Sequence, residues 1–258
     1  MNKVIITLTI FSFLITHYLR PTYFTHRMEL TDRRMPASDQ ALLDAANITV
    51  KAGSDLIREG KYAEAEAILA PAVDSFPGHS FDGLKSLLGE SLIRQSRPKE
   101  ALAVFLELNP GRSDYPRLGY LQVLIGDIRV SRKMWDDFPK VHEIRRDPFF
   151  EGNWPDVDQP DGLKAAWLIA CGVIADTGDP LGADFYLKAA EKLEPNNPIL
   201  LNRFGLIALR ARKFDLAADC MERAVRYATG KLKESSQYDA TRARLIADGY
   251  KKLGKGGV

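Results

Sequence analysis

The sequence of 258 residues has little of what catalytic and metal sites are made from. It contains two cysteines, Cys171 and Cys220, and neither belongs to a CxxC pair. None of its four histidines is spaced from another as a metal ligand would be. A glycine-rich phosphate loop and a Gly-x-Ser-x-Gly motif are absent as well. We therefore expect no cofactor, no metal and no enzyme activity, and we expect both cysteines to be buried free thiols.

The sequence also lacks an excess of charge of one sign. Its 36 basic and 34 acidic residues give a formal net charge of +2. Nucleic-acid-binding proteins usually carry a strong basic surplus, so we expect no nucleic-acid partner. Hydrophobic residues make up 45% of the chain and charged residues 27%, which is typical of globular domains.

One uncharged apolar run, Val4–Leu19, stands near the N-terminus. As a helix it would span roughly 24 Å at about 1.5 Å per residue, slightly less than the hydrocarbon core of about 30 Å. Tyr18, Arg20 and Tyr23 are placed to close this gap at the headgroups. The run predicts one N-terminal transmembrane helix that stays uncleaved. A cleaved signal peptide is the alternative, although no small-x-small cleavage site follows the run.

Basic residues on the two sides of this run predict its orientation. Lys3 precedes it alone, whereas Arg20, Arg27, Arg33 and Arg34 follow it closely. The positive-inside rule then favours a single-pass membrane protein whose body faces the cytoplasm. Residues 21–37 show no hydrophobic period and read as a tether, and a helical pattern begins at Ser38.

The stretch from Leu163 to Tyr227 nearly repeats itself every 34 residues. Ala183 recurs as Ala217, and Cys171 recurs as Gly205. Weaker copies precede it, and their small-residue markers share the place of Cys171. These markers are Gly53, Gly89 and Gly119. A small residue at this place lets two helices pack closely across a short turn.

These residues resemble the tetratricopeptide repeat family, whose 34-residue unit is a helix–turn–helix with small residues at fixed places. The resemblance implies an all-α fold: a right-handed α-solenoid of about five repeats, stacked so that each contacts its neighbours. In the third copy Ser131 replaces the first alanine of the second helix. We assign the chain to seven segments: 1–20 anchor, 21–37 tether, 38–140 repeats one to three with an N-terminal cap, 141–162 insertion, 163–228 repeats four and five, 229–253 capping helix, 254–258 tail.

Two segments outside the repeats carry their own expectations. The insertion holds Phe149, Phe150 and Trp154 among several prolines, and it is either a plug between repeats three and four or a partner contact. The capping helix should turn its larger apolar residues inward. These are Tyr238, Leu245, Ile246, Gly249 and Leu253.

The resemblance implies that the first helix of each repeat lines a concave groove that binds extended peptides or helices. Placing the copies in register puts a group of polar, mostly basic residues there: Lys51, Arg58, Arg94, Arg117, Tyr120, Asn202, Arg203 and Arg210. Arginine binds carboxylates in a bidentate manner, so an acidic peptide or surface is the expected ligand. Ordinary solvated helix positions are the alternative reading.

These observations predict a membrane-held protein-interaction scaffold or assembly factor without catalysis of its own. An exported periplasmic or extracellular adaptor, freed by signal cleavage, is the alternative. A structural subunit that uses its convex face, or an enzyme with a site of scattered residues, are further alternatives.

Overall fold

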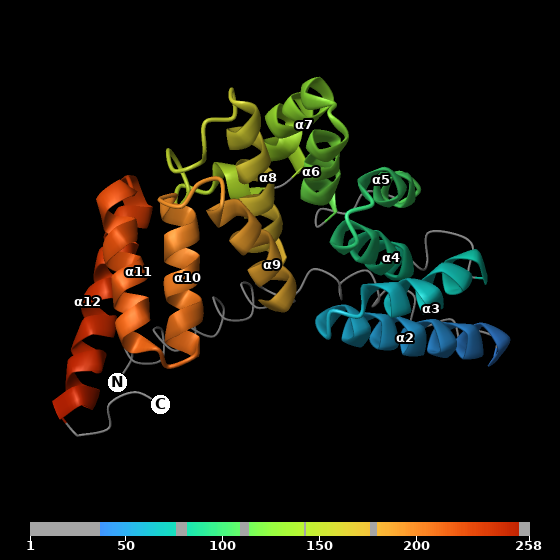
Figure 1. Cartoon of the computed structure of the whole chain (residues 1–258), viewed down its shortest axis with the longest axis horizontal. Coiled ribbons are helices and arrows are strands. Elements are labelled where there is room, and N and C mark those ends of the chain that lie inside the picture. Colours follow the sequence, from blue (N-terminus) through green and yellow to red (C-terminus); the bar gives the residue numbers. More distant parts are fainter. Residues whose placement is uncertain (1–36, 76–81, 109–113, 142, 176–179, 253–258) are drawn as a thin grey trace, which may run out of the picture. The chain divides into compact units, whose positions relative to one another are not determined.

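The computed structural model describes residues 37–75, 82–108, 114–141, 143–175 and 180–252 (Figure 1). All regular structure among these residues is helical, which confirms the predicted all-α class for this part of the chain. The helices are α2 (Ala37–Arg58), α3 (Tyr62–Ser75), α4 (Asp82–Arg94), α5 (Pro98–Leu106), α6 (Tyr115–Ile125), α7 (Ile128–Val141), the short 3₁₀ helix η3 (Glu143–Arg146), α8 (Pro160–Ala175), α9 (Pro180–Glu191), α10 (Pro198–Arg210), α11 (Phe214–Tyr227) and α12 (Gly230–Lys252).

Proline marks the start of four of these helices. Pro98, Pro160, Pro180 and Pro198 are the first residues of α5, α8, α9 and α10. Proline suits this place because the first N–H groups of a helix have no intrahelical partner and its fixed φ is already helical. The prolines therefore set helix boundaries that the repeat period alone leaves open.

The same tight turn recurs between paired helices. Gly60, Ser96, Gly126 and Arg212 all have positive φ, and each lies two residues before the second helix of its pair. In all four turns, the backbone N–H of the residue that follows donates to the carbonyl five residues before it, over 2.8 to 3.0 Å. This is the Schellman arrangement, which satisfies the last carbonyls of a helix. Its recurrence relates α2–α3, α4–α5, α6–α7 and α10–α11 as copies of one unit.

Successive pairs pack on one another. Helix α3 contacts α4, α5 contacts α6, α6 contacts α8, and α10 contacts both α8 and α9. Such neighbour-to-neighbour packing agrees with a tetratricopeptide-like helical solenoid. All contacts discussed below lie within residues 46–258, which belong to one compact unit. The handedness of the superhelix remains a prediction.

Glycines mark the closest approaches within the pairs. A Cβ on Gly53 would lie 2.8 Å from Leu69, and one on Gly205 would lie 2.6 Å from Met221. In α8 the equivalent residue is Gly172, whose Cβ would lie 2.6 Å from Leu187. The alignment of Cys171 with Gly205 was therefore wrong by one residue. Cys171 lies instead near Arg117, Glu90 and Asp114, which belong to the preceding repeats.

The third repeat shows why a serine replaces the usual alanine. The Ser131 hydroxyl donates to the Gly119 carbonyl over 2.9 Å and accepts from the Trp167 indole over 2.8 Å. Trp167 itself lies so close to Gly119 that a Cβ there would overlap its ring. Ser131 thus supplies the hydrogen bond that a buried indole N–H needs.

The insertion packs against the repeats as a plug. Phe150 and Asn153 are buried, and the Trp154 ring meets Trp135 of α7 edge-on at 5.3 Å. Asn153 also accepts a hydrogen bond from the backbone N–H of Thr229, over 2.9 Å, and its carbonyl accepts one from Asn197 over 3.1 Å. The plug reading agrees with these contacts, but the insertion reaches further than expected, from repeat three to repeat five and α12.

The predicted inner face of the capping helix was wrong at Tyr238, Leu245 and Gly249, which are exposed, whereas Ile246 is half-buried. Tyr238 and Leu245 are about 70% exposed. The face that packs on α10 and α11 carries smaller residues, namely Leu232, Ser236, Ala240, Ala243 and Ala247. These small residues allow α12 to lie close to α11, whereas the larger ones are left outside. Leu253 lies outside the described residues.

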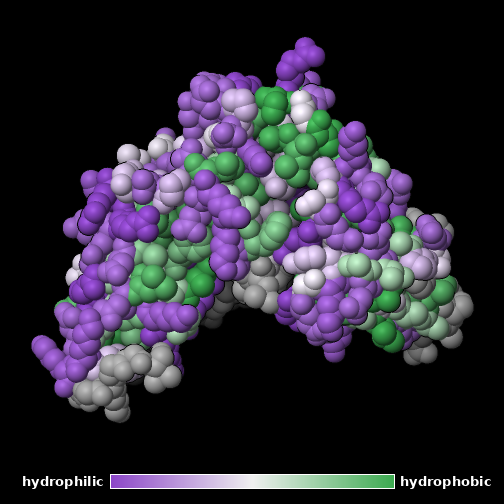
Figure 2. All heavy atoms as spheres, in the orientation of Figure 1, coloured by the Kyte–Doolittle hydropathy of each residue, from purple (hydrophilic) through white to green (hydrophobic). Residues whose placement is uncertain are grey.

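The predicted membrane anchor also lies outside the described residues. Among the helices that the structure describes, none combines the length and the apolar character that a bilayer crossing needs. The face drawn in Figure 2 is mainly hydrophilic, with apolar side chains in patches, one of them over α6 and α7. The anchor over Val4–Leu19 therefore stays a prediction.

Candidate peptide-binding pocket

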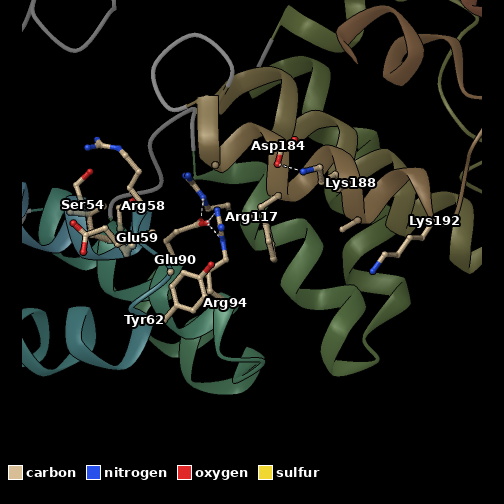
Figure 3. Close-up of a pocket in the computed structure, with 17 residues that line it drawn as sticks. Ser54, Arg58, Glu59, Tyr62, Glu90, Arg94, Arg117, Asp184, Lys188 and Lys192 are labelled. Atoms are coloured by element: carbon tan, nitrogen blue, oxygen red, sulfur yellow. Dashed lines mark hydrogen bonds and ion pairs between the residues drawn. The ribbon is translucent and has the colours of Figure 1, made fainter. Parts of the chain in front are cut away.

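A pocket of about 490 Å³ lies between the first, second and fourth repeats (Figure 3). One wall is the end of α2 and the turn after it, from Ser54 to Gly60. The opposite wall runs from Gly182 to Lys192, that is, α9 and the residue after it, and we call it the α9 wall. Residues of α4 and the side chain of Arg117 from α6 form its base. The volume falls in the range of about 300–1,000 Å³ that small-ligand sites occupy.

A buried carboxylate, Glu90, organises the base of the pocket. One of its oxygens accepts from Nε of Arg94 over 2.7 Å. The other accepts from Nε of Arg117 over 2.9 Å and from the hydroxyl of Tyr186 over 2.6 Å. These bonds join α4, α6 and α9, so one side chain holds three repeats together. We call Glu90, Arg94, Arg117 and Tyr186 the Glu90 cluster.

The charges of the Glu90 cluster support one another. Burial disfavours the carboxylate, but Arg117, Arg94 and the Tyr186 hydrogen bond outweigh it and hold the pKa of Glu90 below its ordinary value. Burial likewise opposes the charge of Arg94, yet the Glu90 carboxylate raises the pKa of this guanidinium. Burial and the nearby Glu90 charge raise the pKa of Tyr186 well above its ordinary value. At neutral pH the cluster is therefore one carboxylate, two guanidinium groups and a neutral phenol.

Arg94 also joins the base of the pocket to its α9 wall by stacking. Its guanidinium carbon lies 3.8 Å from the ring centroid of Phe185 and 5.6 Å from that of Tyr186. A guanidinium over an aromatic face is attracted by the ring quadrupole, and more so when water is excluded. The Arg94 side chain is only 6% exposed, so its role is to hold the two walls rather than to meet a partner.

The walls of the pocket carry more accessible cations. Arg58 ends α2 and pairs with Asp55 over 2.7 Å, and Lys188 pairs with Asp184 over 2.6 Å. Lys192, the residue after the end of α9, lines the same wall as Lys188, and Figure 3 shows both side chains beside the cavity. In all, five basic side chains line the pocket against three carboxylates, Glu59, Glu90 and Asp184. The lining thus has a formal surplus of two positive charges.

The structure brings together three of the eight predicted site residues and separates the rest. Arg58, Arg94 and Arg117 all line the pocket. Lys51 is exposed on α2 and does not line it.

Four more predicted residues lie elsewhere. Tyr120 is buried behind the Glu90 cluster, edge-on to Tyr186, and burial raises its pKa to about 12. Asn202 is 1% exposed and donates to Ser236 of α12 over 3.0 Å. Arg203 stacks over Phe150 of the insertion, and Arg210 lies exposed at the end of α10.

The α9 wall was missed by reasoning from the sequence. Lys188 and Lys192 lie on or after the second helix of a repeat, and the register assigned groove positions to first helices. Their spacing of four residues, with Asp184 four residues before, is a detectable pattern of one helix face. The tertiary fold brings α9 near residues of α2 and α4, and a 34-residue repeat period does not predict this.

Both cysteines are free and buried. Burial raises the pKa of the Cys171 thiol far above its ordinary value, despite the opposing charge of Arg117. Among the residues that the structure describes, no three His, Cys, Asp or Glu side chains gather as metal ligands would.

Comparison with known proteins gives one family. Residues 50–116, about a quarter of the chain, match the model of a family described as Tetratricopeptide repeat. A search of curated proteins found no match to the chain. The matched region runs from α2 to the start of α6 and contains two of the four recurring turns. The match, together with the paired helices, supports a tetratricopeptide repeat protein, and such repeats generally mediate protein–protein interactions.

Proposed function

We propose that the protein is an interaction scaffold or assembly factor that binds an acidic segment of a protein partner in the pocket. This proposal rests on the lining of the pocket, which includes five basic side chains and three carboxylates. A positive cavity between low-dielectric walls concentrates field lines and attracts negative ligands. Of the basic residues, Arg58, Lys188 and Lys192 are exposed and would meet the partner.

We propose further that the protein has no catalytic activity of its own. Both oxygens of the buried Glu90 carboxylate accept hydrogen bonds from two arginines and a tyrosine, so neither is placed to take a proton from a substrate. The Cys171 thiol is a poor nucleophile, because burial raises its pKa and the thiolate is the reactive form.

The proposed scaffold is held at a membrane by Val4–Leu19, with the repeats on the cytoplasmic side. Anchoring would raise the effective concentration of membrane partners near the pocket without any new contact. An exported adaptor is the alternative. Mass spectrometry of the mature protein separates the two, because a cleaved chain yields no peptide from Lys3–Leu19.

The pocket proposal is tested by crosslinked pull-down from detergent-solubilised membranes. One variant reverses the accessible charges of the pocket: Arg58→Glu, Lys188→Glu and Lys192→Glu. A matched control reverses three exposed lysines that do not line it: Lys51→Glu, Lys99→Glu and Lys233→Glu. Arg94 and Arg117 are left unchanged because their loss would unpair buried Glu90.

We expect a partner that the intact chain and the control variant capture and the pocket variant loses. A partner retained by the pocket variant would contradict the pocket as binding site and point to the outer surface. Loss with the control instead would show that Lys51, Lys99 or Lys233, and not the pocket residues, contacts the partner. Circular dichroism of both variants establishes that neither result reflects unfolding.

A further inference from the structure

The α9 wall presents two lysines in one row. Lys188 lies on α9 and Lys192, four residues further along, is the first residue after its end; both side chains line the pocket. Lys188 pairs with Asp184, but the Lys188 side chain is 64% exposed, so solvent also reaches it. Lys192 makes no ion pair with any residue that the structure describes. The row therefore holds one positive charge that is partly paired and one that is not.

The spacing of this row matches that of an extended peptide. Four residues of helix rise about 6 Å along its axis. In an extended chain, side chains on one face recur every second residue, which is about 6.6–6.8 Å. Two acidic residues separated by one residue can thus each reach a lysine while the peptide runs along α9. Two adjacent acidic residues cannot, because they point to opposite sides.

The middle residue of such a peptide would face away from α9, toward the other side of the pocket. There the lining includes Ile57 of α2 and Leu87 of α4. Both are apolar, and Leu87 is half-buried at the pocket's base. An apolar side chain fits this side, since small sites commonly combine apolar lining with a few placed polar groups.

We propose that the pocket recognises an extended partner segment of the pattern acidic–apolar–acidic, whose two carboxylates pair with Lys188 and Lys192. This inference rests on the proposed function, and it assigns specificity to α9 instead of the arginines at the base. Arg94 and Arg117 are positioning residues here: both pair with Glu90, and they hold α9 against α4 and α6.

The test compares two labelled peptides of identical composition, which share a glycine–serine frame. One contains Glu-Leu-Glu, and the other contains Leu-Glu-Glu. Fluorescence anisotropy gives the Kd of each for the full chain in detergent at low salt. Exposed ion pairs are individually weak, so we expect the first peptide to bind about fivefold more tightly. The preference should shrink as salt rises.

Variants connect this preference to α9. The double variant Lys188→Glu, Lys192→Glu should bind both peptides weakly and without preference. The control Lys99→Glu, Lys233→Glu carries the same change of charge on exposed helix positions and should keep the preference.

The outcomes separate the two proposals. If both peptides bind equally and the Lys188/Lys192 variant loses both, the spacing is wrong although the acidic-segment function stands. If the fivefold preference persists in that variant, the assignment to α9 is wrong. If neither peptide binds to the intact chain, the acidic-segment function itself falls.

Discussion

Two junctions of this molecule hold their helices together by opposite means. Where α4, α6 and α9 meet, a buried carboxylate binds two arginines and a tyrosine around a pocket. Where α10, α11 and α12 meet, the core is a cluster of alanines: Ala208, Ala217, Ala218 and Ala243. Its buried polar contact is the hydrogen bond from Asn202 to Ser236.

The difference follows from how far apart the joined segments lie in the sequence. Helices α10, α11 and α12 are consecutive, so short connections already hold them and small side chains let them touch. Helix α9 joins α4 across 96 residues through the Tyr186–Glu90 bond. It does so beside an open pocket that apolar packing alone would fill. A directional, charged link can hold two walls apart at a fixed distance, which alanine packing cannot do.

The largest expected effect comes from breaking the charged junction. Glu90→Gln removes the carboxylate that the buried Arg94 and Arg117 share, although Asp114 still pairs with Arg117, and should lower the free energy of unfolding by about 3 kcal/mol. Ser236→Ala at the other junction removes one neutral hydrogen bond and should cost about 1 kcal/mol. Urea denaturation at pH 7 gives both values.

The pH dependence identifies the cause. The pKa of Glu90 is lowered in the folded state, so its contribution is fully present above the ordinary value of about 4.3 and is lost as the pH falls toward the folded value. The stability gap between wild type and Glu90→Gln should therefore narrow below about pH 4, whereas that of Ser236→Ala stays level. A Glu90→Gln gap that is independent of pH would show that packing, not charge, holds this junction.

A smaller effect distinguishes the two regions by rigidity. A Cβ at Gly119 would overlap the Trp167 ring, which Trp135 and Ser131 hold in place. Gly119→Ala should cost about 2–3 kcal/mol. At Gly205 the neighbour is flexible Met221, and alanine is the better helix former, so Gly205→Ala should cost about 1 kcal/mol or less.

Thermal unfolding followed by circular dichroism compares these two variants under one condition. Tryptophan fluorescence, from the contacting rings of Trp135, Trp154 and Trp167, provides a second signal near Gly119. Equal losses of stability in the two variants would mean that the side chains around Trp167 move aside as readily as Met221 does.

The smallest expected effect lies on the outer face of α12. Tyr238→Ser and Leu245→Ser each remove a side chain that is about 70% exposed. Each should change the free energy of unfolding by no more than about 0.5 kcal/mol. Ala243→Ser, on the buried face of the same helix, is the matched control and should cost more. A large loss of stability in Leu245→Ser would instead support the prediction from the sequence that Leu245 packs inward.

The sequence predicted the helical pairs because their contacts are local and leave small residues at fixed intervals. Gly53, Gly89 and Gly205 each meet a large side chain of the following helix, as the 34-residue period requires. Two small residues in succession hid the register of α8, since either Cys171 or Gly172 satisfies the pattern. The inner face of α12 was missed because burial there favours alanine, whereas the prediction followed the largest apolar residues.

The pocket was predictable in part for the same reason. Arg58, Arg94 and Arg117 belong to first helices, and register alone placed them on one side of the array. The sequence does not reveal that Glu90 pairs with two of them, because the partners of Glu90 come from three repeats. Nor does it reveal the α9 lysines. Tyr120 and Asn202 share the register of groove residues, yet neighbouring helices bury them.

The hydrogen bonds of Asn153 have a consequence for how the molecule unfolds. Repeat arrays in which each unit contacts its neighbours alone can lose their ends one unit at a time. Asn153 bonds to Thr229, 76 residues further along the chain, and its carbonyl meets Asn197 at the start of α10. The C-terminal repeats therefore cannot fray without also breaking these hydrogen bonds to the insertion. Because of the hydrogen bonds of Asn153, we expect this part to open as a single cooperative unit. Amide exchange rates in α10 and α12 should then match.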